Sequence, residues 1–157
     1  MVGRMQGWGE CTDNLSPAVR RRTMQAIRSD HTQLEERVCR ALWHTGVRYR
    51  RNVRGLLGVP DIAVKKVKVA IFLDSCFWHG CPDHGNIPHH NREYWERKLA
   101  RNQQRDAAVN LYYQTLGWTV LRIWEHEAQR DLAGVVARVV GSLRGTETIT
   151  TADGGER

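Results

Sequence analysis

Apolar and polar residues follow one another in patterns that predict a mixed α/β fold. Apolar positions recur at helical spacing in three segments, which we predict to be helices: 32–46, 91–116 and 131–143. Four segments are apolar or alternate with period two, and we predict them to be strands: 47–52, 61–64, 68–74 and 118–124. Residues 69–73 form an unbroken apolar run, which is typical of a strand buried on both faces. No segment repeats, so the chain predicts a single α/β domain.

Two aspartates mark the ends of neighbouring strands. Asp61 follows Pro60 directly at the start of one strand, and Asp74 ends the next. If residues 65–67 join these strands as an antiparallel pair, both carboxylates lie at one end of the hairpin. Two carboxylates so close repel each other unless a cation separates them. Hard oxygen ligands of this kind favour Mg²⁺.

A capping box begins the helix predicted over 32–46. Thr32 can accept from the amide of Glu35, and the Glu35 carboxylate can reach back to the amide of Thr32. The spacing alone therefore favours a capping role for Glu35 over a chemical one.

The charge of the chain points to a polyanionic partner. The 157 residues carry a formal net charge of +7 with a sequence pI of about 9.7, which favours nucleic acid. No apolar run approaches the roughly 20 residues that span a bilayer, and the N-terminus lacks the apolar core of a signal peptide, so we expect a cytoplasmic protein. Composition divides the chain into a flexible arm (1–15), one domain (16–143) and a disordered tail (144–157).

Metal-ligating side chains gather directly after Asp74. Cys76, Cys81 and His84 offer three ligands, and in a reducing compartment such a cluster predicts zinc more than a disulfide. His126, just past the strand 118–124, is the best candidate for the fourth, with His89 and His90 as alternatives. Four protein ligands would make the site closed and structural.

His79 lies inside this loop but does not fit the ligand spacing. A fixed imidazole near a Mg²⁺ site can serve as a general base, and an ordinary surface histidine fits the spacing equally well.

Aromatic and basic residues suggest a nucleic-acid surface. Phe77 and Trp78 are adjacent, as are Tyr94 and Trp95, so we expect at least one ring of each pair to be exposed. Exposed rings can stack on bases or wedge between them. Ser16 and Pro17 predict the start of a helix whose arginines contact phosphates or line a solvated face: Arg20, Arg21, Arg22 and Arg28. Asn102 and Asp106 share one face of the helix 91–116, a face that either is solvated or looks into the site.

Taken in order, these motifs resemble one family. The chain reads Met24-Gln-Ala-Ile, Leu34-Glu, Pro60-Asp, Cys76-Phe-Trp-His-Gly-Cys-Pro, Tyr94-Trp-Glu-Arg-Lys, Asn102, Arg105-Asp and Gly117-Trp through Trp124-Glu. This order is similar to that of the very short patch repair (Vsr) endonucleases, over about residues 16–143. The Cys-Phe-Trp-His sequence is the most specific part of the resemblance.

The resemblance implies a restriction-endonuclease-like mixed sheet flanked by helices, with a structural zinc. It implies recognition of T:G mispairs that arise from 5-methylcytosine deamination, and Mg²⁺-dependent nicking of the strand 5′ to the mispaired T. It implies roles for particular residues: Asp61 and the Leu73 carbonyl hold Mg²⁺, Glu35 is an acid near the metal, His79 is the general base oriented by Asp106, Cys76, Cys81, His84 and His126 bind zinc, and Phe77, Trp78 and Trp95 form the wedge.

The chain departs from the wider pattern at one position. Asp74-Ser-Cys occupies the place of the Glu-x-Lys found in many restriction-like nucleases, and some family members carry histidine where this chain has Asp74. The implied partners are double-stranded DNA with a T:G mismatch, mismatch-repair proteins and a repair polymerase. The resemblance also implies that the protein is associated with the bacterial nucleoid. Nicking one strand requires only a monomer.

Overall fold

A four-stranded mixed sheet forms the centre of the computed structural model, which describes residues 16, 18 and 32–150. The elements in chain order are α2 (Gln33–His44), β1 (Arg50–Arg51), β2 (Ile62–Val64), the 3-10 helix η1 (Lys65–Val67), β3 (Val69–Asp74), α3 (Arg92–Thr115), β4 (Thr119–Trp124), α4 (Glu125–Arg130) and α5 (Leu132–Thr150). The predicted α/β class with a mixed sheet is confirmed. No helix in these residues is long and apolar enough to cross a membrane.

The strand order is β1-β2-β3-β4, and the pairing changes direction at β3. β2 and β3 pair antiparallel, with Ile62 opposite Ile71, so the predicted hairpin joined through residues 65–67 is confirmed. β3 and β4 pair parallel, and α3 makes the crossover between them. β3 therefore has a strand on each side, in keeping with its continuous apolar sequence.

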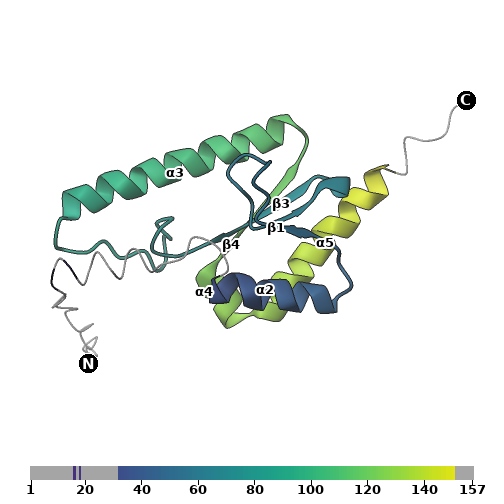
Figure 1. Cartoon of the computed structure of the whole chain (residues 1–157), viewed down its shortest axis with the longest axis horizontal. Helices are drawn as coiled ribbons and strands as arrows, with labels where there is room; N and C mark the ends of the chain where they lie inside the picture. Colours follow the sequence, from purple (N-terminus) through teal and green to yellow (C-terminus); the bar gives the residue numbers. More distant parts are fainter. Residues whose placement is uncertain (1–15, 17, 19–31, 151–157) are drawn as a thin grey trace, which may run out of the picture.

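Helices cover both faces of the sheet (Figure 1). On one face, Ile71 and Ile123 pack with apolar residues of α2 and α5. On the other face, Phe72 packs with Val109 and Tyr113 of α3. Successive β3 side chains thus enter opposite cores, as the two-residue period of a strand requires.

Parallel pairing brings the ends of β3 and β4 to one edge of the sheet. Asp74 lies opposite Trp124 in the register, so the segment after Asp74 and the start of α4 leave the sheet together. The loop 75–91 then leads into α3, whose first turns carry ion pairs at i,i+4 spacing, Arg92–Glu96 and Glu93–Arg97. This edge is where the predicted site residues meet.

Three elements differ from the predictions. β1 spans two residues of the predicted 47–52, and α4 was not predicted at all. α5 continues to Thr150, beyond residue 143 where the predicted helix ended, because a helix already formed extends through non-proline residues at little further cost. The predicted arm, the helix predicted from Ser16–Pro17 apart from residues 16 and 18, its arginines (Arg20, Arg21, Arg22 and Arg28), and residues 151–157 lie outside the described residues.

Candidate active site and metal centre

Asp61 is fixed at the start of β2 by a hydrogen bond from the neighbouring strand. The amide of Leu73 donates to Asp61 Oδ2 at 2.7 Å. Burial raises the pKa of Asp61 to about 6; this hydrogen bond opposes the rise, while the charges of Glu35 and Asp74 add to it. A half-buried carboxylate near two others is suited to binding a cation, which would remove the cost of ionising it.

Leu73 presents a second oxygen at the same place. In an antiparallel pair the N–H and C=O of one residue point towards the same neighbouring strand. Because the Leu73 amide reaches Asp61, its carbonyl lies on that side of β3 as well. A carboxylate and a backbone carbonyl are hard oxygen donors, so this pair fits Mg²⁺ by donor chemistry.

Glu35 serves as the predicted cap and also contributes to the charge around Asp61. Its amide donates to Thr32 Oγ1 at 3.2 Å, and its carboxylate accepts from the Thr32 amide at 3.4 Å, so the capping box is confirmed. The side chain is nevertheless almost fully buried, and its charge raises the pKa of Asp61. The two roles predicted for Glu35 are compatible, and its part in chemistry stays a prediction.

Asp74 is buried, and the cation beside it is an arginine. Arg122 Nη1 donates to both carboxylate oxygens of Asp74, at 2.8 and 2.7 Å. The guanidinium also reaches Asp106, with Nη2 3.2 Å from Oδ1. The repulsion expected around Asp74 is thus relieved within the protein itself.

His79 and Asp106 are brought together as the family resemblance implied. His79 Nδ1 lies 2.6 Å from Asp106 Oδ2 and 3.6 Å from Asp74 Oδ1. Since an ionised carboxylate only accepts, we assign the proton to Nδ1, which leaves Nε2 as the basic nitrogen. The shared face of α3 that carries Asp106 therefore does look towards the site.

The four predicted aromatic residues form one cluster. Phe77 lies 5.0 Å from Trp78 and 5.2 Å from Trp95 between ring centroids, and Tyr94 lies 5.3 Å from Trp95. Tyr94 is exposed, and the other three rings are half-buried. These rings therefore retain accessible surface, as a wedge requires.

A lysine and an asparagine of α3 hold the aromatic cluster. Lys98 Nζ lies 4.9 Å from the Trp78 centroid and 5.4 Å from that of Trp95. Asn102 Nδ2 donates to the Trp78 carbonyl at 2.9 Å. Asn102, predicted as a DNA contact, thus anchors the loop backbone; its DNA contact stays a prediction.

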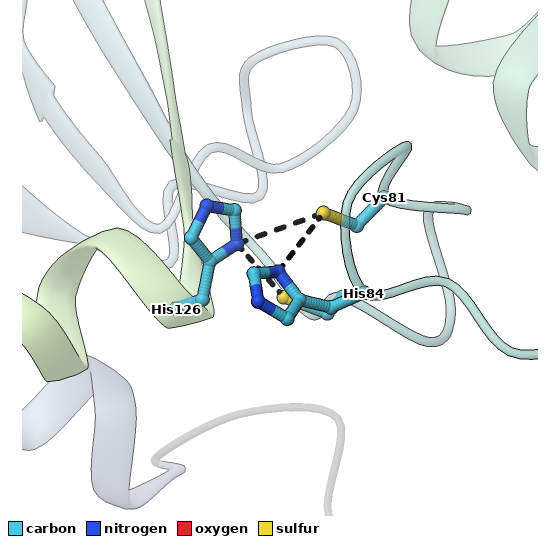
Figure 2. Close-up of side chains that lie close together, drawn as sticks. Cys81, His84 and His126 are labelled. Atoms are coloured by element: carbon cyan, nitrogen blue, oxygen red, sulfur yellow. Dashed lines mark hydrogen bonds between the residues drawn. The ribbon is translucent and has the colours of Figure 1, made fainter. Parts of the chain in front are cut away.

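The predicted cysteine and histidine ligands converge. One ligand atom from each of Cys76, Cys81, His84 and His126 lies within 4.8 Å of the others. Figure 2 shows His126 at the beginning of α4 pointing towards the loop that carries Cys81 and His84. His89 and His90, the alternatives to His126, are not part of this group.

Three separations within this group are close to those expected around a tetrahedral zinc. Bond lengths of zinc to sulfur and nitrogen imply about 3.6 Å between two ligands of a tetrahedron. His126 Nδ1 lies 3.2 Å from Cys76 Sγ and 3.6 Å from Cys81 Sγ, and His84 Nδ1 lies 3.9 Å from Cys81 Sγ. Two thiols and two imidazoles are also the donors that zinc prefers.

Arg122 is the one central site residue that the sequence analysis missed. It lies within an otherwise apolar strand stretch, Val120-Leu-Arg-Ile-Trp. A charge in such a strand requires a buried partner, so its position was a usable signal for a carboxylate nearby.

Known proteins similar to this chain are named as mismatch endonucleases or type II nicking enzymes. The family described as "DNA mismatch endonuclease Vsr" matches residues 12–84. A relative named type II nicking enzyme V.NaeI, from Lentzea aerocolonigenes, is 46% identical over 83% of this chain and 80% of its own. Type II nicking enzyme V.NmeDIP of Neisseria meningitidis serogroup C is 36% identical (84% and 90%), and DNA mismatch endonuclease Vsr of Escherichia coli K12 is 34% identical (69% and 70%).

Proposed function

Because the chain belongs to the Vsr family of endonucleases, we propose that it recognises T:G mispairs in duplex DNA and nicks the strand 5′ to the mispaired T with Mg²⁺. The observation that carries the proposal is the continuity of residues 77–79. Phe77 and Trp78 belong to the aromatic cluster, and the next residue, His79, pairs with Asp106. Detection and chemistry thus share one short stretch of backbone.

His79 acts as the general base in this proposal. Asp106 holds the Nδ1 side of the ring at 2.6 Å, so Nε2 is free to accept a proton from the attacking water. This is the arrangement by which a carboxylate orients a catalytic imidazole in hydrolases.

Asp61 and the Leu73 carbonyl are the residues that would hold Mg²⁺. Bound there, the ion would supply positive charge for the phosphate and lower the pKa of a water. The half-buried Asp61 carboxylate, whose pKa is raised to about 6, is best accommodated when a cation lies beside it. Glu35, buried nearby, would orient water around that position.

The aromatic cluster provides the basis for mismatch preference. Inserting rings into a duplex costs a few kcal/mol of stacking, and the cost is least where a mispair already weakens the stack. Lys98 lies over the rings, and the exposed Arg101 and Arg105 add positive charge further along the same helix for phosphate contact.

Zinc held by Cys76, Cys81, His84 and His126 would fix the aromatic loop to α4. With all four ligands from the protein, its role would be structural. Nicking one strand needs only one active site, so a monomer is part of the proposal.

A strand-resolved nicking assay tests the proposal. Two duplexes of identical sequence, one with T:G and one with C:G at a single position, are incubated with the zinc-loaded protein and Mg²⁺. We expect cleavage of the T-containing strand 5′ to the T, and little cleavage of the paired duplex. Equal rates on the two duplexes, or double-strand breaks, would contradict the mismatch function.

A further inference from the structure

Arg122 lies in β4 with its guanidinium between the two carboxylates that approach His79. Nη1 bonds both oxygens of Asp74, Nη2 lies 3.2 Å from Oδ1 of Asp106, and Nε donates to Asn110 Oδ1 at 3.0 Å. All three guanidinium nitrogens therefore have partners, and two of the partners, Asp106 and Asn110, lie one turn apart on α3.

The guanidinium is also held from the side. Phe72, opposite Arg122 in the strand register, places its ring 4.8 Å from the guanidinium carbon. The Arg122 side chain is 18% exposed and that of Asp74 is 4% exposed. An arginine with this many partners and so little exposure has one orientation, and it fixes the groups that it binds.

Two carboxylates compete for the same nitrogen of His79. Asp106 Oδ2 lies 2.6 Å from Nδ1, and Asp74 Oδ1 lies 3.6 Å from it. Because Arg122 engages both oxygens of Asp74, the Asp74 carboxylate is turned towards the guanidinium. Asp106 gives only its Oδ1 to Arg122 and keeps Oδ2 for the histidine.

From this geometry we propose that Arg122 is a positioning residue, which sets the orientation of His79 by holding Asp106 and occupying Asp74. The inference rests on the proposed function, in which His79 takes the proton from water. Without Arg122, no cation lies between Asp74 and Asp106. Both carboxylates can then accept from His79, so the ring no longer has one defined orientation.

Lysine cannot replace this arginine. Its ammonium is a compact charge that can neutralise Asp74, but it lacks the planar fork that reaches Asp106 and Asn110 at the same time. The Arg122→Lys variant therefore retains the charge and removes the geometry, which separates the two contributions.

Single-turnover nicking of the T:G duplex by the zinc-loaded full chain, at saturating Mg²⁺, tests the role. For Arg122→Lys we expect the rate of the chemical step to fall about 100-fold, the loss typical of a small misplacement of a catalytic group. The DNA dissociation constant, measured separately, should change less than about twofold, because the guanidinium is bound to protein groups. The control is Arg138→Lys on α5, whose ion pair with Glu127 lies outside the proposed machinery, and it should nick at the wild-type rate.

The double variant Asp74→Asn/Arg122→Gln removes both charges of this ion pair and distinguishes positioning from neutralisation. If Arg122 only neutralises Asp74, the double variant recovers the wild-type rate, and that result would overturn the proposal. We expect it to stay slow, because Asp106 still lacks its support. A loss confined to DNA affinity would also overturn it.

A second measurement needs no catalysis. The short hydrogen bond from His79 Nδ1–H to Asp106 should give a downfield proton resonance in the NMR spectrum of the free protein. The resonance is identified by its absence in His79→Gln. We expect it to shift or broaden in Arg122→Lys, and an unchanged resonance contradicts positioning. The proposed function fails in a different way: the wild type would then cut the T:G and C:G duplexes at equal rates, whatever the Arg122 variants do.

Discussion

The Leu73 amide donates to Asp61 Oδ2 at 2.7 Å, which links the half-buried carboxylate just before β2 to the end of β3. Burial outweighs this hydrogen bond and raises the pKa of Asp61 to about 6 from an ordinary 3.8. The folded protein therefore binds this proton more tightly than the unfolded chain. The free energy of unfolding therefore falls as the pH rises through the window from about 4 to 6. A cation bound beside the carboxylate would offset this loss.

Replacing Asp61 with asparagine should thus stabilise the metal-free protein while ending catalysis. In magnesium-free buffer at pH 7.5 we expect the free energy of unfolding of Asp61→Asn to exceed that of the wild type by up to about 3 kcal/mol, narrowing as the pH falls towards 4. Urea titration at several pH values measures the difference. Nicking should be abolished and DNA affinity retained.

The control for the stability measurement is Glu93→Gln, an equivalent carboxylate-to-amide change at a side chain that is 83% exposed. It should change the free energy of unfolding by less than about 0.5 kcal/mol at any pH. A wild-type stability that does not fall between pH 4 and 6 would show that Asp61 ionises without cost.

The parts of this site that come from neighbouring elements could be predicted from the sequence. The hairpin of β2 and β3 follows from two apolar runs and a three-residue connection, and it places Asp61 beside the end of β3. The capping box of Glu35 is likewise written in four consecutive residues. In each case the contacts lie within one supersecondary unit, whose register the local pattern determines.

The parts that depend on distant segments were harder to predict. Arg122 meets Asp74 across 48 residues of sequence, and only the parallel pairing of β3 and β4 brings them together. α4 has six residues and follows β4 without a break, so it is too short to show a helical period. His126 was found only because zinc chemistry required a fourth ligand, which the loop itself did not supply.

The cysteine and histidine group should bind one zinc per chain. We expect Cys81→Ser to lose the zinc, measured by elemental analysis, since a hydroxyl is a poor zinc ligand. Without zinc the loop 75–91 should become a site of limited proteolysis, because the ion links it to α4. Nicking should be lost in parallel.

Cys39→Ala is the matched control for this experiment. Cys39 is also a buried free cysteine, but it packs in the apolar core with α5 and is not part of the metal-ligating group. It should retain full zinc content. Wild-type protein purified with no zinc, or Cys81→Ser with a full equivalent, would contradict the site.

Removing a ring from the aromatic cluster should weaken discrimination between mismatched and paired DNA. Trp78 packs against Phe77 and Trp95 and carries Lys98 above it. For Trp78→Ala we expect affinity for the T:G duplex to fall about 10- to 100-fold, the value of one base–aromatic contact. Affinity for the C:G duplex, which is hard to open, should fall much less.

Trp43→Ala provides the comparison, since Trp43 is an exposed tryptophan on α2 that contacts Arg48 and Tyr49. It should leave the ratio of the two affinities unchanged. If Trp78→Ala weakens both duplexes equally, the ring contributes to general DNA binding and not to mismatch recognition.

Two adjacent tyrosines of α3 should differ in their contribution to stability. Tyr113 is fully buried, and its hydroxyl donates to the Leu57 carbonyl at 2.8 Å, which fastens the loop before β2 to the helix. Tyr112 is 44% exposed. Tyr113→Phe removes a part-buried hydrogen bond and should lower the free energy of unfolding by about 0.5–1.5 kcal/mol. Tyr112→Phe should change it by less than about 0.5 kcal/mol.

Since the loop ends at Asp61, chemical denaturation of both variants should be paired with nicking assays. Tyr113→Phe should retain its rate wherever it is folded, because the Leu73 hydrogen bond still holds Asp61. A lost rate in a folded Tyr113→Phe protein would mean that this anchor, 56 residues away in sequence, also fixes the carboxylate.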